Sequence, residues 1–154
     1  MANPRFLMLA LVLLPSAIFS QDRKESVRRI DPSGLSMPHG YAQVVLVERG
    51  RTVYIAGQIP LDKDGKLVGA GDFGAQARQT FQNLKIALAA VGLTFADVVS
   101  MNTYVTDMSQ LDKYRQISSE YVTSEPPAAT LVEVTALPEP EAMIEVSAIA
   151  VARK

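Results

Sequence analysis

The sequence predicts an α+β domain in which two helices cover one face of a mixed β-sheet. Segments with strand and helix patterns follow one another in the order β-β-α-β-α-β-β, and this alternation is typical of such an architecture. The last segment, residues 144–151, is apolar at nearly every position, as in a central strand that is covered on both faces. Because the helices can cover only one face of the sheet, we expect another subunit to cover the other.

Composition indicates one domain and excludes several kinds of site. The chain has 154 residues and a net charge of −1, without the basic face or tail that nucleic-acid binding requires. The absence of cysteine excludes disulfides, thiol nucleophiles and zinc–thiolate centres. The single histidine, His39, is not part of a cluster with metal-ligand spacing, so we expect no metal. We interpret His39 as a residue of a surface loop.

The first twenty residues have the pattern of a secretory signal peptide. Arg5 precedes an apolar run at residues 6–14, and Ser20 or Ala17 fits the small residue before a cleavage site. The run is too short to cross a bilayer comfortably. An uncleaved anchor and a misassigned start codon are the alternatives. We expect a secreted or periplasmic protein that does not associate with membranes after cleavage.

The remaining chain divides into a polar tail at residues 21–29 and a folded domain at residues 30–154. Up to residue 40 the chain is polar and rich in Pro and Gly, which predicts an extended segment without regular structure. About 130 residues remain after removal of the leader, which is enough to bury one core.

The first half of the domain is expected to hold a β-hairpin and a long helix. Residues 42–47 and 52–56 are apolar runs around a Gly-containing turn, which is the pattern of a hairpin. Asp72 is expected to cap a helix that continues to Val91 and stops at Gly92. Apolar residues at helical spacing predict its buried stripe: Ala77, Phe81, Leu84, Leu88 and Val91.

The second half is expected to add a strand, a helix and two further strands. Residues 98–106 alternate in polarity, with Val99, Met101 and Val105 on one face. A helix over residues 109–122 ends before two prolines, and its inward residues are Leu111, Tyr114, Ile117 and Tyr121. Two strands complete the domain, at residues 130–135 and 143–152.

Several short motifs follow one another along the domain. They are Gly40-Tyr41-Ala42-Gln43, Ala56-Gly57-Gln58-Ile59-Pro60-Leu61-Asp62, Thr103-Tyr104-Val105-Thr106-Asp107-Met108, Val132-Glu133-Val134 and Ile144-Glu145-Val146. Together and in this order they resemble the RidA/YjgF (reactive intermediate deaminase) family. The resemblance implies a chorismate-mutase-like fold and a homotrimer with three clefts between subunits. It also implies that deaminase-type members hydrolyse enamines and imines, such as 2-aminoacrylate, to ketoacids and ammonia without a metal or an organic cofactor.

Two residues that the resemblance implies for this chemistry are replaced. Imine hydrolysis needs a bound substrate, a delivered proton and a positioned water. In the deaminase type an arginine in a Pro-Ala-Arg-Ser/Thr motif binds the substrate carboxylate through its guanidinium fork. Here the stretch is Pro127-Ala128-Ala129-Thr130, and the methyl group of Ala129 cannot pair with a carboxylate. The glutamate that positions water corresponds to Ser147, whose hydroxyl is no base near neutral pH.

The same resemblance makes four further residues candidates for the cleft. Thr130 follows Ala129, Tyr41 matches a cleft tyrosine, and Gly57 matches a glycine whose backbone N–H lines the cleft. Arg115 stands where the type has an asparagine. We hypothesise that Arg115 offers its guanidinium to the cleft from a new direction; the alternative is a solvated surface arginine. For Tyr41 and Gly57 the alternatives are a packed aromatic and a strand-end glycine.

Three functions are compatible with these residues. The first is a trimeric protein whose cleft binds a small metabolite, such as a carboxylate or an imine, without the 2-aminoacrylate reaction. The second is an enamine or imine deaminase, a hydrolase of C=N bonds, with a rearranged site. The third is a chaperone-like stress-response binding protein that uses the surface of the trimer. An exported protein would rarely meet cytoplasmic 2-aminoacrylate, which favours the first function over the second.

Overall fold

The computed structural model of the chain describes residues 26–153. Its strands and helices are, in order, β1 (Val27–Ile30), β2 (Val44–Val47), β3 (Arg51–Gln58), α1 (Phe73–Ala89), β4 (Val98–Val105), α2 (Leu111–Tyr121), β5 (Ala128–Glu133) and β6 (Ile144–Ala152). Short 3-10 helices precede β4 and α2. The predicted signal peptide at residues 1–20 and most of the predicted polar tail lie outside the described residues.

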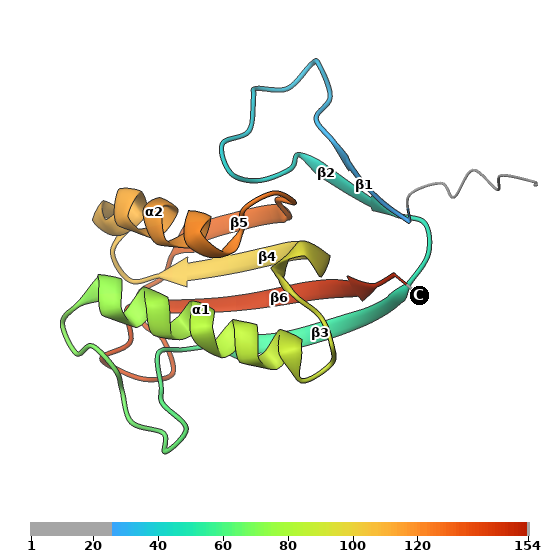
Figure 1. Cartoon of the computed structure of the whole chain (residues 1–154). Coiled ribbons are helices and arrows are strands. Elements are labelled where there is room, and N and C mark those ends of the chain that lie inside the picture. Colours follow the sequence, from blue (N-terminus) through green and yellow to red (C-terminus); the bar gives the residue numbers. More distant parts are fainter. Residues whose placement is uncertain (1–25, 154) are drawn as a thin grey trace, which may run out of the picture.

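The main sheet has four strands in the order β3-β6-β4-β5. β4 and β5 are parallel, whereas β6 is antiparallel to both of its neighbours. Figure 1 shows α1 and α2 on one face of this sheet. The mixed α+β architecture predicted from the sequence is therefore confirmed, and β6 is the inner strand that its apolar composition predicted.

The core lies between the two helices and the sheet. In α1, the predicted stripe residues Ala77, Phe81, Leu84 and Leu88 are each 0% exposed. Tyr114 and Ile117 of α2 are buried against them, and Phe81 stacks on Tyr121 with a centroid separation of 5.0 Å. β6 contributes its alternate residues, which are Ile144, Val146, Ala148 and Ala150. The burial of this apolar surface holds the helices on the sheet.

The limits of α1 follow from local chemistry at each end. Asp72 accepts hydrogen bonds from the N–H groups of Gly74 at 2.8 Å and Ala75 at 3.1 Å, which confirms the predicted N-cap. The predicted membership of Val91 in the buried stripe is wrong, because the helix ends at Ala89 and Val91 is 45% exposed in the turn that follows. Gly92 ends this turn with a φ of +73°, a conformation that glycine adopts without a steric cost.

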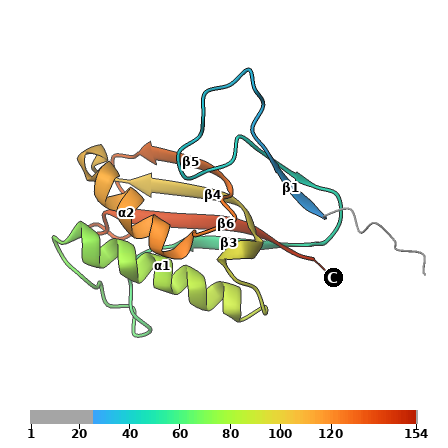
Figure 2. The same ribbon diagram turned by 45° about the horizontal axis from the view of Figure 1, so that its top comes forward.

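The predicted hairpin between residues 42–47 and 52–56 is wrong. β2 pairs with β1 in a separate two-stranded sheet, and β3 pairs with β6. Figures 1 and 2 show β1 and β2 set apart from the four strands. The reason is hydrophobic burial, because Val27 of β1 is 3% exposed and packs with Val99 and Val151 on the sheet face away from the helices. β1, which lies in the segment expected to be polar and without regular structure, therefore pairs with β2 in place of β3.

The predicted common face of Val99 and Met101 is also wrong. The pairing of β4 with β6 shifts register between Val98 and Ser100, which places one extra residue in β4. As a result Val98 and Met101 belong to the helix-facing core, whereas Val99 packs in the second cluster with Val27.

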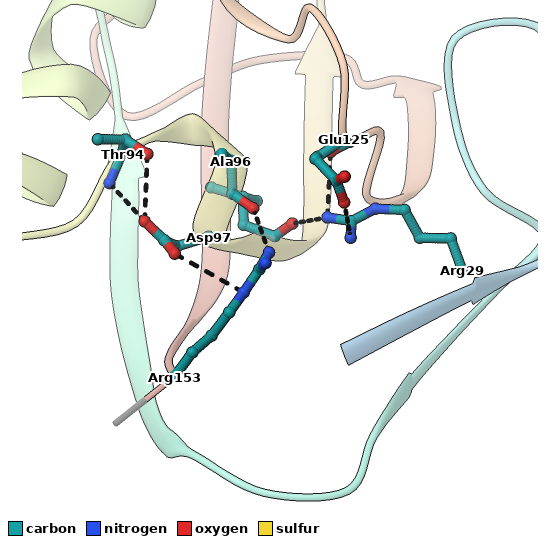
Figure 3. Close-up of polar contacts among 7 residues, drawn as sticks. Arg29, Thr94, Ala96, Asp97, Glu125 and Arg153 are labelled. Carbon is teal, nitrogen blue, oxygen red and sulfur yellow. Dashed lines mark hydrogen bonds and ion pairs between the residues drawn. The ribbon is translucent and has the colours of Figure 1, made fainter. Parts of the chain in front are cut away.

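Arg29 attaches β1 to the rest of the domain. Its side chain is only 14% exposed, although the sequence placed it in a polar tail. The guanidinium donates to the carbonyl oxygens of Pro126 at 2.8 Å, Glu125 at 3.2 Å and Val98 at 3.3 Å. It also pairs with the Glu125 carboxylate (Figure 3). These contacts fix the chain just before β5, so Arg29 helps to place the strand that contains Ala129.

The sheet face away from the helices is partly open. Val53 and Ile55 of β3 pack in the core, so Tyr54 between them faces the other side, where it is 79% exposed. Val132 of β5, next to the core residue Leu131, is 39% exposed. Within residues 26–153 no helix is long and apolar enough to span a bilayer.

Candidate functional site

A cavity of about 480 Å³ lies between α2, β5 and the loop at residues 39–41. Its apolar wall consists of Met101, Leu111, Tyr114, Val122, Ala129 and Leu131. The polar residues that line it are His39, Tyr41, Arg115, Ser118, Ser119 and Thr130. We call this cavity the α2–β5 pocket. An apolar wall with a few polar groups, in a volume of this size, is typical of a small-molecule site.

β5 supplies the pocket wall because it is the edge strand of the sheet. Ala129 is opposite Met101 of β4, and Thr130 is opposite Asn102. Both β5 residues are exposed. At the start of β5 the carbonyl oxygen of Pro127 accepts a hydrogen bond from the N–H of Ala42 at 2.8 Å. This bond holds the loop that contains His39 and Tyr41 beside the strand.

The helical repeat explains the contribution of α2. Leu111, Arg115, Ser118 and Val122 follow one another at intervals of three or four residues, so they lie along one side of the helix. Tyr114 lies deeper, and its hydroxyl is 3.0 Å from the hydroxyl of Thr103. Burial raises the pKa of the Tyr114 phenol, while hydrogen bonds with Thr103 and Ser118 oppose that rise. The phenol thus remains neutral and forms part of the pocket wall near neutral pH.

Arg115 is the one permanently charged side chain among the described residues that line the pocket. Its side chain is 57% exposed, and its Nη1 is 3.5 Å from Oδ1 of Asp112, a side chain that is 98% exposed. An ion pair this exposed contributes little. The guanidinium carries five N–H donors, and the contact with Asp112 engages only its Nη1 group.

The remaining sequence-predicted residues lie elsewhere. Val146 and Ala148 face the helices, so Ser147 between them faces the opposite side of the sheet, beside Asn102 of β4. Gly57 of β3 lies against the side chain of Glu145, whose carboxylate occupies the space that a Cβ at Gly57 would need. Within one chain, neither Ser147 nor Gly57 lines the α2–β5 pocket.

The structure therefore groups Tyr41, Arg115, Ala129 and Thr130 in one pocket. Ser118 and Ser119 were not predicted to line it, although they follow Arg115 at helical spacing. His39, which the sequence predicted to lie in a surface loop, lines the same pocket. Among residues 26–153 no group of three or more His, Cys, Asp or Glu side chains is placed to hold a metal ion.

The family model described as Endoribonuclease L-PSP matches residues 34–152, and a Rid-family protein of known structure has the same fold. The chain belongs to the RidA/YjgF family. That structure, the Rid-family protein YyfB of Yersinia pestis, is 37% identical with a TM-score of 0.77, and the match covers 83% of this chain and 100% of the other. The predicted family is thereby confirmed.

Two curated relatives of this RidA-family chain are DfrA of Myxococcus xanthus and a human protein. DfrA is 40% identical over 111 residues, which are 72% of this chain and 84% of DfrA. The human protein, named 2-iminobutanoate/2-iminopropanoate deaminase, is 33% identical over 111 residues, which are 72% of this chain and 79% of the human one.

Proposed function

We propose that this RidA-family protein binds a small carboxylate-bearing metabolite in the α2–β5 pocket and does not deaminate 2-aminoacrylate. One observation carries the proposal: Arg115 is the single permanently charged residue that lines the pocket, and none of the described lining residues carries a carboxylate. A guanidinium is the side chain best suited to bind a carboxylate, because its fork matches two oxygens. The cation comes from α2 instead of β5, where Ala129 presents only a methyl group.

The absence of deamination follows from the missing base. Hydrolysis of a C=N bond requires a group that orients and deprotonates water. Ser147 stands where the family resemblance implies a glutamate, and its hydroxyl faces the side of the sheet away from the helices. A carboxylate held by Arg115 would therefore be bound without a carboxylate base beside it.

A rearranged imine deaminase is the second candidate, and His39 favours it. The imidazole lines the same pocket as Arg115, and its ring nitrogens can donate or accept a hydrogen bond. The human relative is named as a deaminase of 2-iminobutanoate and 2-iminopropanoate. In this alternative Arg115 holds the substrate and His39 takes the part of the absent glutamate.

The assembly and the compartment are part of the proposal. A homotrimer would cover the open sheet face on which Tyr54 is 79% exposed, and it would make the pocket a cleft between subunits. The leader pattern at residues 1–20 supports export to the periplasm or the medium. Light scattering of purified protein tests the trimer, and N-terminal sequencing of protein recovered outside the cytoplasm tests cleavage.

Ammonia release distinguishes the two candidate activities. An amino-acid oxidase generates imines in situ, and ammonia is measured with and without the mature protein. We expect no acceleration with 2-aminoacrylate or 2-iminobutanoate, together with saturable binding of propionate by calorimetry. Turnover that disappears in His39→Gln would establish the rearranged deaminase instead, and the absence of both turnover and binding would refute both candidates.

A further inference from the structure

The α2–β5 pocket is much larger than a three-carbon acid. If each heavy atom takes the volume of a liquid water molecule, about 30 Å³, propionate takes at most about 150 Å³. The cavity of about 480 Å³ would then be two-thirds empty. A ligand that fills an apolar pocket removes its wall from water, so it gains affinity.

The unfilled part of the pocket is apolar. Met101, Leu111, Val122 and Leu131 line it together with Ala129. Met101 is 3% exposed and belongs to the main core, so the pocket floor is the edge of that core. Ala129 is the smallest of these side chains and is exposed, so the free space adjoins β5 at this residue. A longer side chain at this position would extend into the cavity.

The polar groups of α2 lie on a different element from the strand residues of this wall, Met101, Ala129 and Leu131, whereas Leu111 belongs to α2 itself. Arg115, Ser118 and Ser119 come from α2, and the carboxylate of a ligand bound to Arg115 could also accept hydrogen bonds from the serine hydroxyls. The rest of such a ligand would extend toward Ala129 and Leu131. The pocket thus has a charged end and an apolar end, which suits an amphipathic ligand.

We infer that the ligand class is monocarboxylates with a large apolar or aromatic side chain, and that Ala129 is the residue that admits this side chain. The inference rests on the proposed function and specifies its ligand. By the same volume estimate 3-phenylpropionate takes about 330 Å³, which fits the cavity. Burial of a phenyl ring raises affinity roughly 10- to 100-fold, and each buried methylene about fourfold.

Calorimetric titration of the mature protein with propionate and 3-phenylpropionate tests the inference. We expect 3-phenylpropionate to bind at least about tenfold more tightly, because the two acids differ only in the ring. Ala129→Leu should weaken 3-phenylpropionate about tenfold and propionate less than twofold, because leucine fills the apolar end. Ala89→Leu, at an exposed position of α1 outside the pocket, is the matched control and should change neither affinity.

Different outcomes separate the inference from the proposed function. Equal affinities for the two acids in the wild-type protein, or equal weakening of both by Ala129→Leu, would overturn the ligand class while leaving carboxylate binding intact. Failure of both acids to bind the wild-type protein would overturn the proposed function itself. The comparison of the two acids in the wild-type protein remains decisive even if the leucine variant does not fold.

Discussion

Replacement of Arg29 by methionine should destabilise the domain far more than its position in a polar N-terminal segment suggests. Methionine keeps an unbranched side chain but removes three hydrogen bonds to carbonyl oxygens and the ion pair with Glu125. A hydrogen bond from a charged group contributes about 1.5–3 kcal/mol. The bond to Pro126 at 2.8 Å should contribute in full, whereas the bonds at 3.2 and 3.3 Å are long and should contribute less. Because the Glu125 side chain is 40% exposed, we add at most about 1 kcal/mol for the ion pair.

These contributions are not additive, since one guanidinium makes them all, and we expect a loss of about 3–4 kcal/mol in the free energy of unfolding. Arg153→Met is the matched control. Arg153 donates to the carbonyl of Ala96 at 2.8 Å, and its Nε lies 3.9 Å from the Asp97 carboxylate (Figure 3). Its side chain is 34% exposed, so we expect a loss of about 1 kcal/mol.

Urea unfolding followed by far-UV circular dichroism measures both variants. The protein concentration must be the same throughout, because the stability of an oligomer depends on it. A loss for Arg29→Met no larger than that for Arg153→Met would refute the conclusion that Arg29 attaches β1 to the segment before β5.

Three further substitutions test the core, the helix cap and a buried phenol. Phe81→Ala should lower the free energy of unfolding by about 3–5 kcal/mol, because the ring is 0% exposed and stacks on Tyr121. A decrease below about 2 kcal/mol in thermal unfolding would contradict the described core. Asp72→Ala removes the N-cap of α1 and should lower the free energy of unfolding by about 1 kcal/mol, whereas Asp72→Asn should keep most of the capping stabilisation. Equal losses for the two variants in urea unfolding would argue against the cap. Burial raises the pKa of Tyr114 above its ordinary value of 10.0. The neutral phenol therefore contributes its full share of the free energy of unfolding below pH 10, and this share is lost as the pH rises through the pKa of the folded state. The difference in unfolding free energy between wild-type protein and Tyr114→Phe should therefore shrink above pH 10, and a difference that stays constant with pH would exclude this linkage.

Local signals in the sequence predicted the elements that carry their own chemistry. The cap at Asp72 and the apolar stripe from Ala77 to Leu88 define α1, and the continuous apolar run of β6 places it inside the sheet. β1 has no such signal, since Val27–Ile30 contains two arginines in four residues and pairs with a strand that begins fourteen residues after it ends. Its burial depends on Val99 and Val151, which are distant in sequence, and local patterns do not report such contacts.

The residues of the site were predictable where a local motif marks them, but the faces of the sheet to which they belong were not. Motif positions identified Tyr41, Arg115, Ala129 and Thr130, which come together in the α2–β5 pocket. The face of the sheet to which Ser147 belongs was not predicted. Apart from Glu145 and Ser147 every residue of β6 is apolar, so the strand lacks the alternation of polar and apolar residues that would distinguish its two faces. The shift in β4 between Val98 and Ser100 likewise changes the face of a residue without a local marker.

The affinity of 3-phenylpropionate for the wild-type protein, Arg115→Gln and Lys113→Gln tests the central claim most directly. Lys113 is an exposed cation on the same helix that does not line the pocket, so its replacement makes the same change in net charge. We predict that Lys113→Gln binds as tightly as the wild-type protein, whereas Arg115→Gln binds at least about tenfold more weakly, as expected for a lost charged hydrogen bond. Unchanged affinity in Arg115→Gln would contradict the claim that this guanidinium binds the carboxylate.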